Sequence, residues 1–133
     1  MSSESAPEPA IPAAAGPIVW VIEADHWPRA LLVAELAERG YNAYGFADIT
    51  GALVALHTRG KRAPALAVVE LAGTDAEQAD LRQLAERDIR LVGLADTRSA
   101  RGPLARELPW SALIRRPCTI GEIADRVGAL LAS

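Results

Sequence analysis

The feature that most constrains the fold of this chain is a series of short, nearly unbroken apolar runs separated by segments of helical periodicity. Residues 18–22, 65–69 and 89–94 contain almost no polar side chain. Runs of this length without a polar alternation are typical of strands that are covered on both faces. Two weaker runs, residues 41–46 and 112–114, complete a set of five predicted strands.

A helix signal follows each predicted strand. The first two predicted helices span Pro28 to Arg39 and, after a cap at Asp48, residues up to about Gly60. The third begins at a capping box at residues 74–77. The last two cover residues 103–108 and 120–131. Strands and helices that alternate through short loops build a parallel sheet with helices on both faces. We therefore predict an α/β, doubly wound, five-stranded parallel sheet as one domain over residues 18–133.

Residues 1–17 differ from this pattern, because Ala, Pro, Ser and Glu dominate them and no periodicity is present. We predict a flexible leader there, since such a composition buries too little surface to offset its ordering entropy. It has no basic region and no long apolar run, so it is not a signal peptide. No segment approaches the roughly 18 apolar residues of a membrane span, and we expect a soluble, cytoplasmic protein with no membrane partner.

Composition excludes several classes of function. The net charge of −3 argues against a protein that binds nucleic acid through its phosphate backbone. The single cysteine, Cys118, and two histidines leave no zinc ligand set, and we expect no metal and no cofactor. No Ser or Cys nucleophile has an evident base, and both histidines fall on predicted helices. We therefore predict that the chain is not an enzyme.

Polar residues gather where the predicted strands end. Glu23 and Asp25 follow the first strand, Glu70 the third, Asp96 the fourth, and Arg116 the fifth. In a parallel sheet these ends meet at one edge, where functional groups collect. Acidic residues from the ends of three strands and a cation from a fourth therefore converge on one edge of the sheet.

At these positions the chain resembles the receiver domain of bacterial response regulators, over roughly residues 17–133. The stretches that carry the resemblance are Val19-Trp-Val-Ile-Glu-Ala-Asp25, Glu38-Arg-Gly-Tyr41, Pro64-Ala-Leu-Ala-Val-Val-Glu-Leu71 and Arg116-Pro117. The resemblance implies a flavodoxin-like sheet in the order 2-1-3-4-5 and a phosphorylation switch. It also implies that an aspartate at the end of the third strand accepts a phosphoryl group, and that an acidic pair after the first strand holds Mg²⁺.

This sequence departs from that pattern at the acidic positions. The phosphoacceptor position holds Glu70, and the acidic pair reads Glu23-Ala24. A glutamate carries one methylene more than an aspartate, which displaces its carboxylate by on the order of 1 Å from an in-line geometry. Without a carboxylate at Ala24, an ion that requires near-octahedral oxygen ligation loses a direct ligand. We therefore expect Mg²⁺ binding to be weak or absent.

The remaining positions implied by the resemblance also differ. The hydroxyl position falls on Ala95, with Thr97 as the nearest substitute, and the aromatic switch position holds Leu113. The lysine position holds Arg116, followed by Pro117 where the family has a cis proline. Together these replacements predict a pseudo-receiver with a degenerate phosphoacceptor site.

Three roles for Glu70 remain open at this point. It could form a structural ion pair with Arg116, stand in for the phosphorylated state, or take part in residual ion or phosphate binding.

A candidate interface lies towards the C-terminus. From Asp96 onward the chain has six arginines and four acidic residues, which suits an acidic protein partner. Arg106 and Trp110 are the candidate contact residues, although Trp110 could instead cover the fifth strand. Trp20 is predicted to lie in the core, and His26 with Trp27 to pack over the sheet edge.

Three functions compete. The first is a phosphorylation-independent signalling module that binds a signalling protein or a second copy of itself, because no output domain follows Ser133 in this sequence. The second is an atypical response regulator phosphorylated on Asp25 or Asp96. The third is a small-molecule site of the flavodoxin-like kind, although no Gly-rich phosphate loop follows the first strand.

Overall fold

Five parallel strands form the centre of the molecule. The structure, a computed structural model, describes residues 16–58, 60 and 62–133. The strands are β1 (Ile18–Ile22), β2 (Asn42–Phe46), β3 (Leu66–Glu70), β4 (Arg90–Ala95) and β5 (Ala112–Arg115). They pair in parallel in the order β2-β1-β3-β4-β5, which confirms the predicted sheet.

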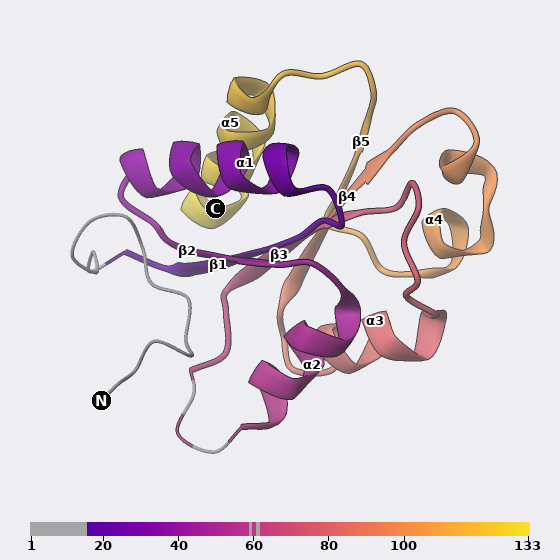
Figure 1. Cartoon of the computed structure of the whole chain (residues 1–133), viewed down its shortest axis with the longest axis horizontal. Coiled ribbons are helices and arrows are strands. Elements are labelled where there is room, and N and C mark those ends of the chain that lie inside the picture. The colour runs from indigo at the N-terminus through magenta and orange to yellow at the C-terminus, as the bar shows by residue number, and fades with distance from the viewer. Residues whose placement is uncertain (1–15, 59, 61) are drawn as a thin grey trace.

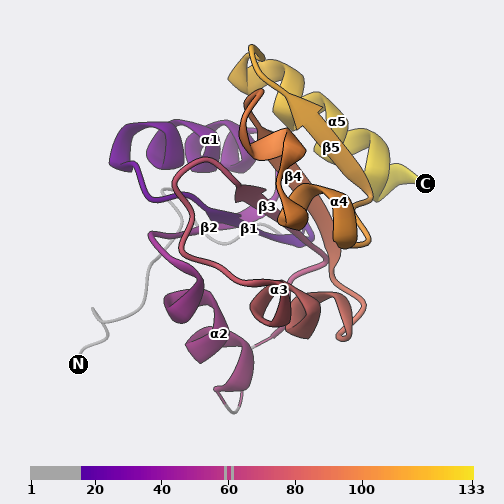
Figure 2. The same ribbon diagram turned by 90° about the vertical axis from the view of Figure 1, so that its right-hand side faces the viewer.

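Helices cover both faces of this sheet, as predicted (Figures 1 and 2). The helices α1 (His26–Glu38) and α5 (Ile120–Ala132) lie on one face. The other face carries α2 (Ile49–His57), α3 (Gln78–Ala85) and α4 (Pro103–Glu107). A 3₁₀ helix, η1 (Ser99–Arg101), precedes α4 and was not predicted.

Alternate residues of the strands feed two separate cores. In β1, Val19 and Val21 pack towards α1 and α5, whereas Trp20 and Ile22 pack towards α2 and α3. Trp20 is buried as predicted and meets the ring of Phe46 edge-on, with ring centroids 4.9 Å apart. Burial on both faces explains why these strands read as continuous apolar runs.

Two local predictions were wrong. The predicted capping box at residues 74–77 does not open α3, which begins at Gln78, where Asp80 accepts a hydrogen bond from the Glu77 backbone N–H (2.9 Å). Thr74 instead accepts from the N–H of Ala76 within the preceding loop (3.1 Å). Trp27 does not pack over the sheet edge, because its residue surface is 71% exposed.

Most of the predicted leader, residues 1–15, lies outside the described residues. Gly16 and Pro17 lie against β2, since the Gly16 carbonyl accepts from the Asn42 side-chain amide (3.1 Å) and the Pro17 carbonyl from the Asn42 backbone N–H (2.9 Å). Among the described helices, none is long and apolar enough to cross a membrane.

Candidate functional site

The site lies at the carboxyl edge of the sheet and is centred on Glu70, the last residue of β3. Strand pairing sets Glu70 beside Leu94 of β4, while Glu23 directly follows the neighbouring strand β1. Arg116 directly follows β5, and its backbone N–H donates to the carbonyl of Ala95 (2.9 Å). The parallel register therefore brings residues that are distant in sequence to one edge.

Glu70 and Arg116 form the ion pair that was one of the open readings of the sequence. The Arg116 Nε donates to Glu70 Oε1 at 3.1 Å, and the Arg116 Nη2 donates to the same oxygen. The other oxygen, Oε2, accepts from the backbone N–H of Ala72 at 3.1 Å. The Glu70 side chain is only 6% exposed, against 35% for Arg116. Both oxygens of a buried carboxylate are thus engaged by the protein itself.

The pair also sets the electrostatics of Arg116. Its hydrogen bonds to Glu70 raise the pKa of the guanidinium above its ordinary value. The peptide bond between Arg116 and Pro117 is cis.

Glu23 lies next to Glu70 but forms no salt bridge with the described part of the chain. Burial raises the pKa of Glu23, and the negative charge of Glu70 adds to that shift. A hydrogen bond from the Asp25 backbone N–H to Glu23 Oε2 (3.0 Å) opposes it. Glu23 and Glu70 both line a cavity of about 140 Å³, whose wall also includes Asp48 and Thr74. This hollow is therefore acidic.

The other two members of the predicted acidic pocket add no carboxylate to this hollow. Ala24 lines the cavity without contributing a carboxylate. Asp25 is exposed, precedes α1 at its N-cap position and is absent from the cavity wall. The structure therefore brings Glu23 and Glu70 together, but not Asp25.

The ion pair also lines a second, smaller cavity of about 50 Å³. Glu70, Arg116 and Cys118 line it together with apolar residues such as Leu32 and Ile123. Burial raises the pKa of the Cys118 thiol, which disfavours the reactive thiolate.

The residues at the end of β4 and directly after it are fixed by burial and by local hydrogen bonds. Ala95 is fully buried, and Thr97 is exposed. The Asp96 carboxylate accepts from the Ser99 N–H (2.7 Å) and from the Ser99 hydroxyl (2.8 Å), and these bonds lower the pKa of Asp96. Asp96 is therefore engaged in starting η1.

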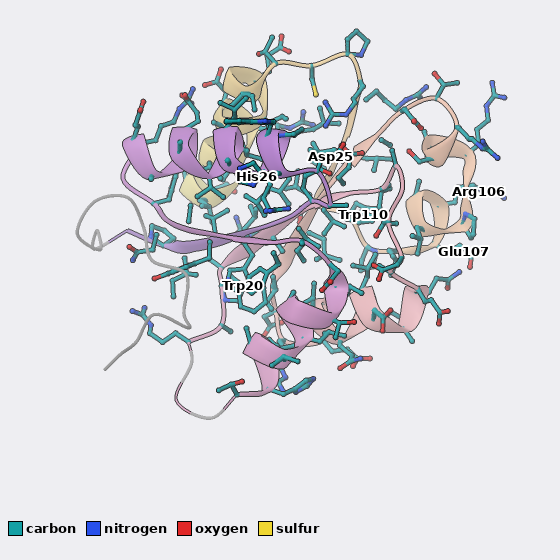
Figure 3. All side chains as sticks on the ribbon, viewed as in Figure 1. Trp20, Asp25, His26, Arg106, Glu107 and Trp110 are labelled. Atoms are coloured by element: carbon teal, nitrogen blue, oxygen red, sulfur yellow. The ribbon has the colours of Figure 1, made fainter. Side chains whose placement is uncertain are left out.

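The predicted interface residues differ in exposure. Trp110 is half-buried, and its indole N–H donates to the carbonyl of Leu104 in α4 (2.9 Å). A Cβ at Gly93 of β4 would come within 3.2 Å of the Trp110 ring and 2.6 Å of Leu113, so both side chains lie against that glycine. Arg106 is exposed, and Figure 3 shows it further out from the sheet than Trp110.

Sequence reasoning missed one residue at this edge. The Arg29 Nη1 donates to the carbonyls of Glu23 (2.8 Å) and Ala24 (3.2 Å), and so ties α1 to the end of β1. Its side chain crosses Gly45 of β2, where a Cβ would come within 2.9 Å of the Arg29 Cγ. The glycine clears that path, but nothing in the sequence alone links the two positions.

Within the described ranges, no three His, Cys, Asp or Glu side chains are grouped so that they could hold a metal ion. What the arrangement does chemically is to neutralise a buried carboxylate with a guanidinium and a backbone N–H.

Comparison with known proteins identifies the fold. No protein-family profile matches the chain, and no curated protein matches it. Solved structures do match. A receiver domain of a histidine kinase from Syntrophus aciditrophicus is 22% identical, with a TM-score of 0.70 over 88% of this chain and 91% of that one.

Two further matches have similar scores. A response regulator receiver protein from Pseudomonas putida is 21% identical, with a TM-score of 0.70 over 87% of this chain and 98% of that one. A streptococcal protein, from a family described as redox sensors that evolved from two-component response regulators, is 17% identical, with a TM-score of 0.71 over 86% of this chain and 51% of that one. The chain therefore has the receiver fold of response regulators, as the sequence resemblance implied.

Proposed function

We propose that this chain is a receiver-like signalling module with a degenerate phosphoacceptor site, which acts by phosphorylation-independent protein–protein interaction. The observation that carries the proposal is the buried ion pair of Glu70 with Arg116. This pair occupies the position at which the receiver domains that the sequence resembles would accept a phosphoryl group.

The chemistry of phosphoryl acceptance supports this reading. A carboxylate that attacks phosphorus needs a free oxygen and a divalent cation beside it. Both Glu70 oxygens already accept hydrogen bonds, from Arg116 and from Ala72. Ala24 offers no carboxylate for the cation, and Asp25 does not line the cavity. The residues present do not suit Mg²⁺, so we expect its binding to be weak or absent.

The same pair supports a fixed rather than a switched state. It joins the end of β3 to the segment after β5 without any added group. A carboxylate supplies one charge and two oxygens, whereas a phosphoryl group supplies nearly two charges and three oxygens. With Ala95 and Leu113 at the positions of the hydroxyl and the aromatic switch, the implied relay between site and surface is missing. The module then presents one surface at all times.

The proposed partner is a protein, and the proposed compartment is the cytoplasm. We do not expect catalysis, nucleic-acid binding or membrane binding. Arg106 is exposed on α4 and is available to an acidic partner. Trp110 is better suited to holding α4, because its indole N–H is already bound to Leu104.

Phosphorylation at another residue remains the alternative function. Asp25 is the stronger candidate, because it is exposed, whereas the Asp96 carboxylate is engaged by Ser99. A small-molecule site is less favoured, since the acidic hollow of about 140 Å³ would repel a phosphate-bearing ligand.

Mass spectrometry after incubation with acetyl phosphate and Mg²⁺ tests the proposal. We expect no mass gain for the natural chain or for Glu70→Asp. As a matched control, Glu70→Asp combined with Ala24→Asp, Ala95→Thr and Arg116→Lys restores the four replaced groups of the phosphorylation site, and we expect it to gain one phosphoryl group. A phosphoryl gain on the natural chain would overturn the proposal, and its position would decide between Glu70 and Asp25.

A further inference from the structure

The helix α1 carries large apolar side chains that face solvent. Trp27 is 71% exposed and Leu31 is 55% exposed. Among the described residues, Val54 of α2 is the one other large apolar residue exposed to this degree, at 62%. Exposed apolar groups that stand together on one helix, rather than scattered singly, mark a contact surface.

The spacing of these residues is that of a helix-pairing seam. Trp27, Leu31, Ala34 and Glu38 follow one another at intervals of four, three and four residues, which is the spacing of the a and d positions of a coiled coil. All four are exposed, whereas Leu32 and Leu36 on the opposite side of α1 are buried against the sheet. We call these four residues the α1 seam. Figure 1 shows α1 lying over one face of the sheet, and the exposure of these four residues places the seam on the solvent side of the helix.

One charge of α1 opposes the helix dipole without compensation: Asp25 at the N-cap and Arg39 at the C-cap suit the dipole, whereas Glu38 does not. The first turn of α1 has no acidic residue and its last turn has no basic residue, while Glu35 and Glu38 lie near its C-terminal end. An acidic group stabilises a helix at the N-terminus and destabilises it at the C-terminus. The charge of Glu35 is compensated by a salt bridge between its Oε2 and the Arg39 Nε (2.9 Å). Glu38 has no ion pair or hydrogen bond with the described part of the chain.

An antiparallel neighbour would reverse this disadvantage. In that arrangement the C-terminal end of one α1 lies beside the N-terminal end of the other. Glu38 would then lie near the free backbone N–H groups of the second helix and near its Trp27 indole N–H, which can donate to the carboxylate. A second copy of this chain provides that neighbour.

We propose that the α1 seam is a self-association surface on which a second copy docks with its α1 antiparallel. Leu31 packs against Ala34 of the second copy, so that a large side chain meets a small one in each layer. Trp27 lies beside Glu38 of the second copy. Because the contact is isologous, each of these pairs occurs twice about a two-fold axis.

The expected dimer is weak and reversible. The helix α1 has 13 residues and is therefore about 20 Å long. A contact built around one such helix pair falls in the small-interface class that is typical of transient association. The proposal goes beyond the proposed function and does not involve Glu70 or Arg116, so the two can fail separately.

Sedimentation velocity of the full chain over a concentration series tests the proposal. We expect a monomer–dimer equilibrium within concentrations up to about 1 mM, and Leu31→Glu to weaken it by at least about tenfold. Val54→Glu places the same charge at an equally exposed apolar position on α2, and we expect no effect from it. Circular dichroism confirms that each variant is folded.

Two results would overturn the proposal. One is a chain that stays monomeric throughout this range, which would leave the α1 seam to a different protein. The other is a dimer that Leu31→Glu and Val54→Glu weaken equally, which would place the contact elsewhere.

Cross-linking tests the register. Chains carrying Leu31→Cys and chains carrying Ala34→Cys, both with Cys118→Ser, are oxidised separately and as a mixture. We expect the interchain disulfide to form fastest in the mixture, because position 31 faces position 34 of the second copy. Equal rates in all three samples would contradict the antiparallel register.

Discussion

Two arginine-centred ion-pair clusters show how the same chemistry differs with its surroundings. At the edge of the sheet, Arg116 pairs with Glu70, whose side chain is 6% exposed. Between α1 and α5, Arg39 pairs with Glu35 and with Asp125, whose side chains are 33% and 74% exposed. Removing a cation from a buried carboxylate leaves a charge that water cannot reach, whereas an exposed carboxylate is hydrated at once. We therefore expect the first pair to contribute more to stability than the second.

The largest effect is expected from Arg116→Ala, which breaks the buried pair. Glu70 keeps the hydrogen bond from Ala72 but loses its cation. We expect the free energy of unfolding to fall by about 2 kcal/mol, measured by urea denaturation. Arg116→Lys keeps the positive charge but lacks the second N–H contact. If its loss of stability lies between those of the natural chain and Arg116→Ala, the charge and the hydrogen-bond geometry each contribute to the pair.

A smaller effect is expected from Glu70→Asp, which shortens the acid rather than removing its partner. The carboxylate retracts from Arg116 by one methylene, and a loss of about 1 kcal/mol follows from one weakened charged hydrogen bond. The same denaturation measurement checks it. A variant as stable as the natural chain would mean that the two strand ends adjust to restore the contact.

The exposed cluster is expected to respond weakly. Arg39→Ala should lower the melting temperature by only a fraction of the shift caused by Arg116→Ala. At an ionic strength of about 1 M, where charges are screened beyond about 3 Å, the small Arg39 effect should shrink further while the Arg116 effect persists. Equal salt sensitivity of the two variants would contradict the contrast between the clusters.

The smallest effect concerns Glu23, a buried acid that forms no salt bridge with the described residues. Burial raises its pKa in the folded chain above the ordinary 4.5, so its stabilising contribution is complete below that pH and is lost as the pH rises through the raised value. Glu23→Gln keeps an acceptor for the Asp25 N–H but cannot ionise. We expect this variant to gain melting temperature over the natural chain at about pH 7 and to gain none at about pH 4.

The sheet could be predicted because its central strands are buried on both faces. A strand of this kind consists almost entirely of apolar residues, as in the runs 18–22 and 65–69. The pairing of Glu70 with Arg116 was within reach as well, since the ends of parallel strands share one edge. The start of α3 was not, because Thr74 can serve a loop hydrogen bond as readily as a helix cap. The exposure of Trp27 also went against expectation, because composition alone does not say which face of a helix a bulky side chain takes.

The contact of Trp110 with Gly93 has a consequence for how the molecule opens. The helix α4 has five residues, too few to persist without tertiary support. Its attachment includes the indole of Trp110, which lies on Gly93 and holds the Leu104 carbonyl. The amide protons of α4 should therefore exchange with solvent as one unit, at the rate at which that indole lifts from the sheet. In Trp110→Phe, which keeps a ring but loses the N–H donor, α4 should exchange faster while β4 keeps its protection.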